Sequence, residues 1–247
     1  MQYALTANSE GIEVLRKKKF SGPLKCVGYG VDTSIFIRSS DKEIASLKSD
    51  MGIPPDATVI GYVGRLLEFK GIDLLLMAFA RLRKAIPEKQ YVLLIVGSGT
   101  AEAALMEQAR QLGIDDSIVR VPSVTQADVP KYMSLIDTLV LPSRRSGMWA
   151  EQFGRVMVEA MAMRIAVIGS SSGSIPEVIG NAGYVFEENN SDDLFEKLCM
   201  VERLSPQEKQ ELLDKGEHRG REHYSWRGFA QACFDALQEA QLRSVHY

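Results

Sequence analysis

The sequence predicts an α/β protein built on a doubly wound, Rossmann-like parallel sheet. Six short apolar runs, most of them rich in Val, Ile or Leu, recur along the chain, and longer amphipathic segments lie between them. Because the runs are apolar almost throughout, we expect strands that are covered on both faces. Repeated alternation of strand and helix favours a parallel sheet, whose right-handed crossovers gather the functional loops at the carboxyl ends of the strands.

The expected strands are each four to six residues long and span residues 59–63, 91–96, 118–121, 138–141, 165–168 and 183–186. The segments between them predict helices. In residues 71–85, for example, the apolar side chains of Ile72, Leu75, Phe79 and Leu82 fall at helical spacing. The expected helices span residues 71–85, 100–112, 128–134, 153–163, 174–179 and 191–201.

Two flanking segments do not follow this repeat. Residues 1 to about 40 are similar to the end of a preceding unit, in which Ser9 is expected to cap a short helix over residues 10–18. Residues 206–243 predict two helical segments that break at Ser225, and Trp226 begins the last of them.

The composition excludes several classes of protein. The 247 residues are 45% hydrophobic and 25% charged, which is typical of a globular chain. The formal net charge of −3 argues against nucleic-acid binding by bulk charge. The three Cys and three His show no metal-ligand spacing, and no apolar run is long enough to span a bilayer. Because the start also has no secretory signal pattern, we expect a reducing, cytoplasmic compartment.

The first candidate site segment runs from Gly61 to Gly71, between an expected strand and an expected helix. Gly64 would allow a sharp turn where the strand ends, and Arg65 and Lys70 would direct two cations at the same loop. The planar fork of Arg and the point charge of Lys together suit a diphosphate. The alternative is an ordinary strand–helix turn with solvated charges.

The second candidate segment contains Glu151 and Glu159, eight residues apart. On one straight helix these side chains would be rotated by about 80° from each other, so we expect Glu151 in the loop and Glu159 within the following helix. Gly154 at the helix start would allow close backbone approach, and free N–H groups there can bind an anion or sugar oxygens. A carboxylate is also a good acceptor for paired hydroxyls. The alternative is an acidic helix start with one glutamate on the polar face.

The third candidate region comprises loops rich in small residues at other strand ends. Gly97-Ser-Gly99 follows one expected strand, and the Ser/Gly-rich loop at residues 169–177 follows another. Each is compatible with an ordinary loop. All of these segments follow strands, so together they would line one edge of the sheet, where open α/β folds bind ligands.

The combined motifs resemble a known family. In chain order they are Val-Asp-Thr-Ser-Ile-Phe at residues 31–36, Gly-Arg-Leu at 64–66, Lys-Gly at 70–71, Pro-Ser at 142–143, and the glutamate pair at 151 and 159. Their order and spacing resemble the sugar-nucleotide-binding half of retaining glycosyltransferases of the GT-B fold, especially family 4. The stretch at 149–155 looks most like bacterial exopolysaccharide enzymes, and the resemblance covers nearly the whole chain.

The resemblance implies a role for each matched residue. Arg65 and Lys70 would neutralise the donor diphosphate and the leaving-group charge, and Glu151 would contact hydroxyls of the transferred sugar. Glu159 would hold the ribose, backbone N–H groups at 153–156 would hold the sugar and β-phosphate, and the loop at 121–124 would pack the base. We expect no metal or other cofactor, because the two cations supply the neutralisation. The implied donor-binding residues are Gly64, Gly97, Val124, Phe153, Gly154, Arg155, Val156 and Glu159.

The sequence also departs from the family pattern. Arg164 and Ala166 stand where the family has Gly and Pro, which leaves the local backbone conformation open. Arg144, Arg145 and Trp149 precede Glu151. They could contact an anionic acceptor or lipid carrier, or they could belong to an ordinary exposed loop.

The resemblance further implies a division of the chain into three parts. Residues 1–35 would be a remnant of an acceptor-side domain and its linker, residues 36–225 the nucleotide-sugar-binding domain, and residues 226–247 a crossover helix.

The expected reaction is transfer of a sugar, of hexosyl type, from a nucleoside diphosphate sugar to a saccharide or lipid-linked acceptor. The isolated chain would be weakly active or inactive without the N-terminal domain or a partner subunit. We expect no nucleic-acid partner and include a peripheral contact with the inner face of the membrane. The alternative function is a non-catalytic subunit that docks a separate acceptor domain or self-associates.

Overall fold

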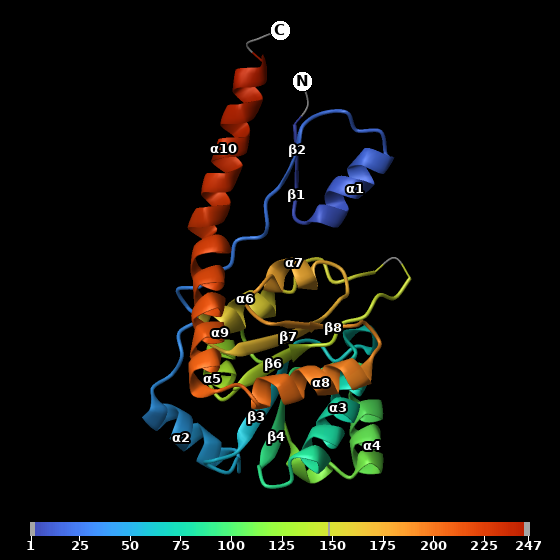
Figure 1. Cartoon of the computed structure of the whole chain (residues 1–247), viewed down its shortest axis with the longest axis vertical. Coiled ribbons are helices and arrows are strands. Elements are labelled where there is room, and N and C mark those ends of the chain that lie inside the picture. Colours follow the sequence, from blue (N-terminus) through green and yellow to red (C-terminus); the bar gives the residue numbers. More distant parts are fainter. Residues whose placement is uncertain (1–2, 148, 245–247) are drawn as a thin grey trace.

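The computed structural model describes residues 3–147 and 149–244, and the predicted parallel sheet lies between two layers of helices (Figure 1). The six strands run parallel in the spatial order β5-β4-β3-β6-β7-β8. Their bounds lie within two residues of the predicted ones. They are β3 Thr58–Val63, β4 Tyr91–Val96, β5 Ile118–Val121, β6 Thr138–Leu141, β7 Ala166–Ser170 and β8 Tyr184–Phe186.

All six helices expected between the strands and after the last one are present. In one layer α3 packs against α4 and α8, and in the other α6 packs against α7 and α9. The six expected helices are α3 Ile72–Ala85, α4 Glu102–Leu112, α5 Val129–Met133, α6 Arg155–Ala162, α7 Ile175–Ile179 and α8 Ser191–Glu202. The helix α9 Pro206–His218 begins the predicted C-terminal flank. Two 3₁₀ turns, η1 Glu68–Lys70 and η2 Asp115–Ser117, and a π-helical segment, η3 Arg219–His223, complete this part of the chain.

The core is formed by the apolar positions that predicted the elements. β4 is buried at every one of its positions, as expected for a central strand covered on both faces. The periodic side chains of α3 form its buried face, with Leu75, Phe79 and Leu82 at 0% exposure. Burial of such side chains supplies about 1.5–3 kcal/mol each relative to exposure.

The flanks contain the predicted helices and a two-stranded sheet that the sequence did not predict. A two-stranded parallel sheet joins β1 Ala4–Thr6 to β2 Leu24–Cys26, with α1 Ser9–Lys17 between them. The last helix, α10 Trp226–Ser244, extends beyond the main body alongside this small sheet (Figure 1). Lys25 forms an ion pair with Glu239 of α10 at 3.3 Å, which connects the two flanks.

The prediction that Ser9 caps α1 is wrong, because Asn8 takes that position. The Asn8 side-chain oxygen accepts a hydrogen bond from the Gly11 amide at 2.9 Å. Its Nδ2 donates to the Gln152 carbonyl at 2.9 Å, and the residue is only 7% exposed. Ser9 instead donates to the Glu177 carboxylate.

The helix α2 Asp41–Asp50 was not predicted, because few apolar residues mark its inner face. Ser40 and Glu43 form a capping box: the Ser40 hydroxyl accepts from the Glu43 amide, and the Glu43 carboxylate accepts from the Ser40 amide. This Ser-x-x-Glu pattern was the available signal in the sequence.

Arg164, one of the departures from the family pattern, adopts a left-handed backbone conformation with φ of 59°. A glycine would tolerate this conformation better by about 1 kcal/mol. The guanidinium donates to Asp214 at 2.6 Å and to Glu217 at 2.5 Å, both in α9. The arginine therefore ties the end of α6 to α9 at the cost of a strained backbone.

We expect Arg164→Ala to lower the free energy of unfolding by about 1–2 kcal/mol, because it removes both ion pairs and keeps the strain. Arg164→Gly should lower the free energy of unfolding by about 1 kcal/mol less than Arg164→Ala, because glycine relieves the strain. Urea denaturation followed by circular dichroism measures both, with Arg110→Ala in α4 as an exposed-arginine control. Equal losses in the Ala and Gly variants would show that the backbone conformation contributes nothing here.

Candidate functional site

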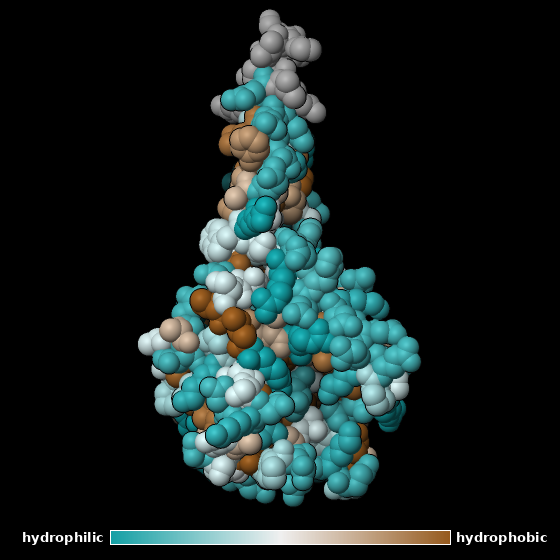
Figure 2. All heavy atoms as spheres, turned by 90° about the vertical axis from the view of Figure 1, so that its left-hand side faces the viewer, coloured by the Kyte–Doolittle hydropathy of each residue, from teal (hydrophilic) through white to brown (hydrophobic). Residues whose placement is uncertain are grey.

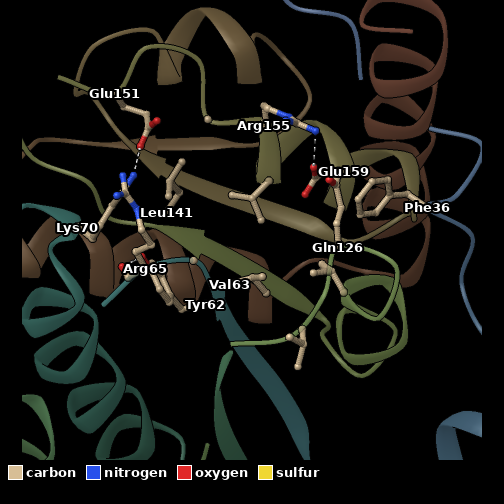
Figure 3. Close-up of a pocket in the computed structure, with 15 residues that line it drawn as sticks. Phe36, Tyr62, Val63, Arg65, Lys70, Gln126, Leu141, Glu151, Arg155 and Glu159 are labelled. Carbon is tan, nitrogen blue, oxygen red and sulfur yellow. Dashed lines mark hydrogen bonds and ion pairs between the residues drawn. The ribbon is translucent and has the colours of Figure 1, made fainter. Parts of the chain in front are cut away.

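A pocket of about 710 Å³ opens at the carboxyl end of the sheet, between β3 and β6, where the strand order reverses (Figure 3). This is the position at which open α/β sheets bind ligands. Its lining includes predicted residues from three separate segments: Gly64, Arg65, Lys70, Val124, Glu151, Gly154, Arg155, Val156 and Glu159. The remaining lining residues, which the sequence reasoning did not select, are Phe36, Tyr62, Val63, Gln126, Val129 and Leu141.

The turn after β3 brings two cations to one side of the pocket. The buried Tyr62 hydroxyl donates to the Arg65 carbonyl at 2.8 Å, which fixes the backbone of the turn. Burial raises the pKa of Tyr62, so this hydroxyl keeps its proton. Figure 3 shows the side chains of Arg65 and Lys70 both directed toward Glu151. Within the described part of the chain, the Arg65 guanidinium has no ion-pair partner, so its charge is available to a ligand.

Lys70 and Glu151 form the more buried of the two ion pairs between lining residues of the pocket. Lys70 Nζ lies 2.6 Å from Glu151 Oε2, and the two side chains are only 12% and 14% exposed. The hydroxyl of Ser143, which is fully buried, donates to the same carboxylate oxygen at 3.1 Å. The Pro-Ser pair after β6 is the sequence signal for Ser143, for which no role in the site is predicted. Lys70 and Ser143 both bond to Oε2, so they fix the orientation of the Glu151 carboxylate in the pocket.

The start of α6 supplies backbone donors to the pocket. Gly154 is the N-cap, and Arg155 and Val156 begin the helix, as the interpretation of Glu151 as a loop residue and Glu159 as a helix residue required. The first-turn N–H groups of a helix have no partner within it and carry a partial positive charge. This end of α6 can therefore bind an anion.

Two predicted residues do not line the pocket. Phe153 is buried, with its ring 5.3 Å from the rings of both Tyr29 and Tyr224. Gly97 is not among the lining residues, and it packs closely against the turn after β3, because a Cβ there would be 1.9 Å from the Gly64 carbonyl oxygen.

Glu159 is a buried carboxylate that faces the pocket from α6. It is 8% exposed, and Arg155 is its ion-pair partner at 3.8 Å. Burial raises the pKa of Glu159 to about 6, and Arg155 opposes that shift. A carboxylate held this way gains from any ligand that donates hydrogen bonds to it. In Figure 3 the Arg155–Glu159 and Lys70–Glu151 pairs lie on opposite sides of the pocket.

Arg144 is engaged in contacts within the protein. Its guanidinium donates to the Glu68 carbonyl at 2.9 and 3.2 Å and to Asp73 at 2.8 Å. The side chain of Arg145 is 48% exposed and pairs with Glu10 at 3.2 Å. Of the two arginines suggested as acceptor contacts, only Arg145 is largely exposed.

Residues 3–147 and 149–244, the part of the chain that the structure describes, contain neither a candidate metal cluster nor a membrane-spanning helix. Among them, no group of three or more His, Cys, Asp or Glu side chains could hold a metal ion. None of their helices combines the length and apolar character that crossing a bilayer requires.

Residues 43–218 match the family model described as glycosyl transferases group 1. The chain belongs to this family. A curated relative, the D-inositol 3-phosphate glycosyltransferase of Saccharomonospora viridis, is 28% identical over 226 residues, which cover 88% of this chain and 50% of that protein. The chain thus spans about half the length of this relative.

Two solved structures share the fold. Sucrose-phosphate synthase from Thermosynechococcus elongatus has a TM-score of 0.75 at 24% identity, over 98% of this chain and 57% of that one. The Anabaena protein HepE, solved in complex with UDP and glucose, has a TM-score of 0.79 at 20% identity, over 95% of this chain and 62% of that one. At these identities the likeness shows the fold, which is the predicted GT-B-type Rossmann-like domain.

Proposed function

We propose that the pocket binds the nucleoside diphosphate sugar of a retaining, family 4 glycosyltransferase, which transfers a hexose to a saccharide or lipid-linked acceptor. The observation that carries this proposal is the convergence of Arg65, Lys70 and the start of α6 on one pocket that also contains Glu159. Membership in the glycosyl transferases group 1 family and the UDP and glucose complex of HepE support it.

Charge stabilisation is the main chemical task in this proposal. Negative charge develops on the diphosphate oxygen as the bond to the sugar breaks. Arg65, Lys70 and the first-turn amides of α6 would stabilise that charge where it forms. These groups take over the neutralisation that a metal ion would otherwise supply. We therefore propose that the reaction needs no metal cofactor.

The other side of the pocket suits the nucleoside. Glu159 would accept hydrogen bonds from the ribose hydroxyls, and Val124 would pack against the base. Glu151, held by Lys70 and Ser143, would accept hydroxyls of the transferred sugar. This arrangement places the two carboxylates on different parts of one donor.

We infer that an acceptor-side domain or partner subunit completes the active site, because the curated relative is about twice as long as the aligned segment. In this proposal residues 1–35 belong to the acceptor side, 36–225 form the donor-binding domain, and 226–247 form the crossover helix. The isolated chain would bind the donor and transfer sugar weakly or not at all. We place the protein in the cytoplasm, with a peripheral contact at the inner membrane face.

Calorimetric titration with UDP and GDP tests the donor site. We expect the wild-type chain to bind at least one of them and Arg65→Ala to weaken that binding by about 10- to 100-fold, since a hydrogen bond to a charged group contributes about 1.5–3 kcal/mol. Arg110→Ala removes an exposed arginine of α4 and should leave the affinity unchanged. Unchanged affinity in Arg65→Ala would contradict the proposed site.

A second candidate function is docking to another protein chain. Phe234 and Leu237 on α10 are 54% and 62% exposed, and Figure 2 shows apolar side chains on the part of this helix that projects from the body. Exposed apolar side chains that gather on one helix favour association. Light scattering separates the candidates: a tight dimer that binds no nucleotide would support this function over the donor site.

A further inference from the structure

Two loops, residues 64–71 and 142–151, meet at Lys70, and two aromatic rings lie between them. The centroids of the Phe69 and Trp149 rings are 4.0 Å apart, with a tilt of 45°. The Lys70 ammonium lies 4.9 Å from the centroid of the Trp149 ring. The same ammonium is bonded to Glu151, so it is held between an aromatic face and a carboxylate.

Backbone and side-chain hydrogen bonds keep these loops together. The Arg144 amide donates to the Phe69 carbonyl at 2.8 Å. The Arg144 guanidinium donates to the Glu68 carbonyl and to Asp73 at the start of α3. Trp149 and Ser146 exchange two backbone hydrogen bonds of 3.0 Å. The indole ring is therefore presented from a fixed backbone.

We propose that Trp149 is a positioning residue for Lys70 and holds the ammonium where the donor diphosphate binds. The inference rests on the proposed function of the pocket. A lysine has a flexible four-carbon stem, and fixing it costs rotamer entropy. Attraction between the ammonium and an indole face offsets part of that cost before the ligand arrives.

The role of Glu151 explains why a second contact to Lys70 is needed. In the proposed site, Glu151 accepts hydroxyls of the sugar, and Lys70 turns part of its hydrogen-bonding capacity to the diphosphate. Lys70 and Glu151 then each bond to the ligand as well as to each other. The contact with the Trp149 ring uses no hydrogen-bond donor of the ammonium, so it remains when the diphosphate is bound.

A double-mutant cycle on the whole chain tests the proposal. UDP or GDP, whichever the wild type binds, is titrated together with the matching monophosphate. We expect Trp149→Ala to weaken diphosphate binding by about 3- to 10-fold, in line with a cation–π contact, and monophosphate binding by less than about twofold. In the Lys70→Met background, the same change should have no further effect. Trp149→Phe, which keeps an aromatic face, should restore most of the affinity.

Tryptophan fluorescence gives an independent readout. The chain contains two tryptophans, so Trp226→Phe leaves Trp149 as the single tryptophan, whose emission is excited selectively over that of the tyrosines. Diphosphate binding should change its emission when Lys70 is present and leave it unchanged in the Lys70→Met variant. If Trp149→Ala does not fold, Trp149→Leu, which is apolar and has no aromatic face, replaces it in the cycle.

The outcomes distinguish a failure of the proposed function from a failure of the positioning role of Trp149. A wild-type chain that binds neither diphosphate overturns the proposed function itself. A wild-type chain that binds one of them, with equal losses from the Trp149 change whether or not Lys70 is present, overturns only the positioning role. Monophosphate binding that weakens as much as diphosphate binding would also overturn that role, because the effect would then not pass through the ammonium.

Discussion

Gly71→Ala should lower the free energy of unfolding by about 2–4 kcal/mol and weaken nucleoside diphosphate binding at least about tenfold. Gly71 has φ of 67°, which costs an alanine about 1 kcal/mol. A Cβ at this position would lie 2.0 Å from the Pro142 carbonyl oxygen, so the backbone of one loop must shift, at about 1–3 kcal/mol. The shift would displace Lys70 on one side and Ser143 on the other, and these residues hold Glu151.

Gly113→Ala is a matched control for this variant. Gly113 also has φ of 67°, but a Cβ there would meet no atom within 4 Å. It should therefore lose about 1 kcal/mol from the backbone conformation alone and keep full ligand affinity. Urea denaturation and calorimetry measure both variants. If the two glycines gave equal losses of stability, the close approach of the loops at Gly71 would have no energetic importance.

Glu159→Gln should stabilise the protein at pH 7 by up to about 2 kcal/mol and weaken nucleotide binding by about 10- to 100-fold. The pKa of Glu159 in the folded chain, about 6, lies above its ordinary value of 4.5 because the carboxyl is buried. The folded state therefore favours the protonated form. This contribution to stability is complete below about pH 4.5 and is lost as the pH rises through 6. An amide of the same shape carries no such penalty, yet it is a weaker acceptor for ribose hydroxyls.

Urea denaturation at several pH values between 4 and 8 measures the stability effect. The wild type should lose stability relative to Glu159→Gln as the pH rises between 4.5 and 6, and the difference should then level off. Glu13→Gln removes the same charge from the exposed side of α1 and controls for net charge. A Glu159→Gln variant that binds UDP and GDP as tightly as the wild type would contradict the role of this carboxylate in donor binding.

The sheet could be predicted because buried strands and their helices leave strong apolar patterns. The charged part of the pocket could be predicted as well, since Arg65, Lys70 and Glu151 follow strands and a parallel sheet gathers strand ends at one edge. The strands β1 and β2 escaped prediction because each has only three residues and none of them is fully buried.

The apolar walls of the pocket were missed for a different reason. Phe36 and Leu141 are almost fully buried, and in sequence they cannot be distinguished from core residues. The prediction for Phe153 concerns its backbone N–H group, and its ring lies against Tyr29 and Tyr224 outside the pocket lining. Sequence reasoning thus locates charges by motif and strand end, whereas the direction of an apolar side chain depends on packing that only the structure shows.

The single amide of Asn8 has a mechanical consequence. Its oxygen caps the N-terminus of α1, and its nitrogen donates a hydrogen bond to the carbonyl of Gln152, 144 positions later in the chain and adjacent to Glu151. A displacement of α1 would therefore reach the backbone beside Glu151, the carboxylate proposed to contact the sugar, through this hydrogen bond, and the Arg145–Glu10 ion pair connects α1 to the same loop. A movement of α1 would shift the Gln152 carbonyl, which belongs to the residue directly after Glu151.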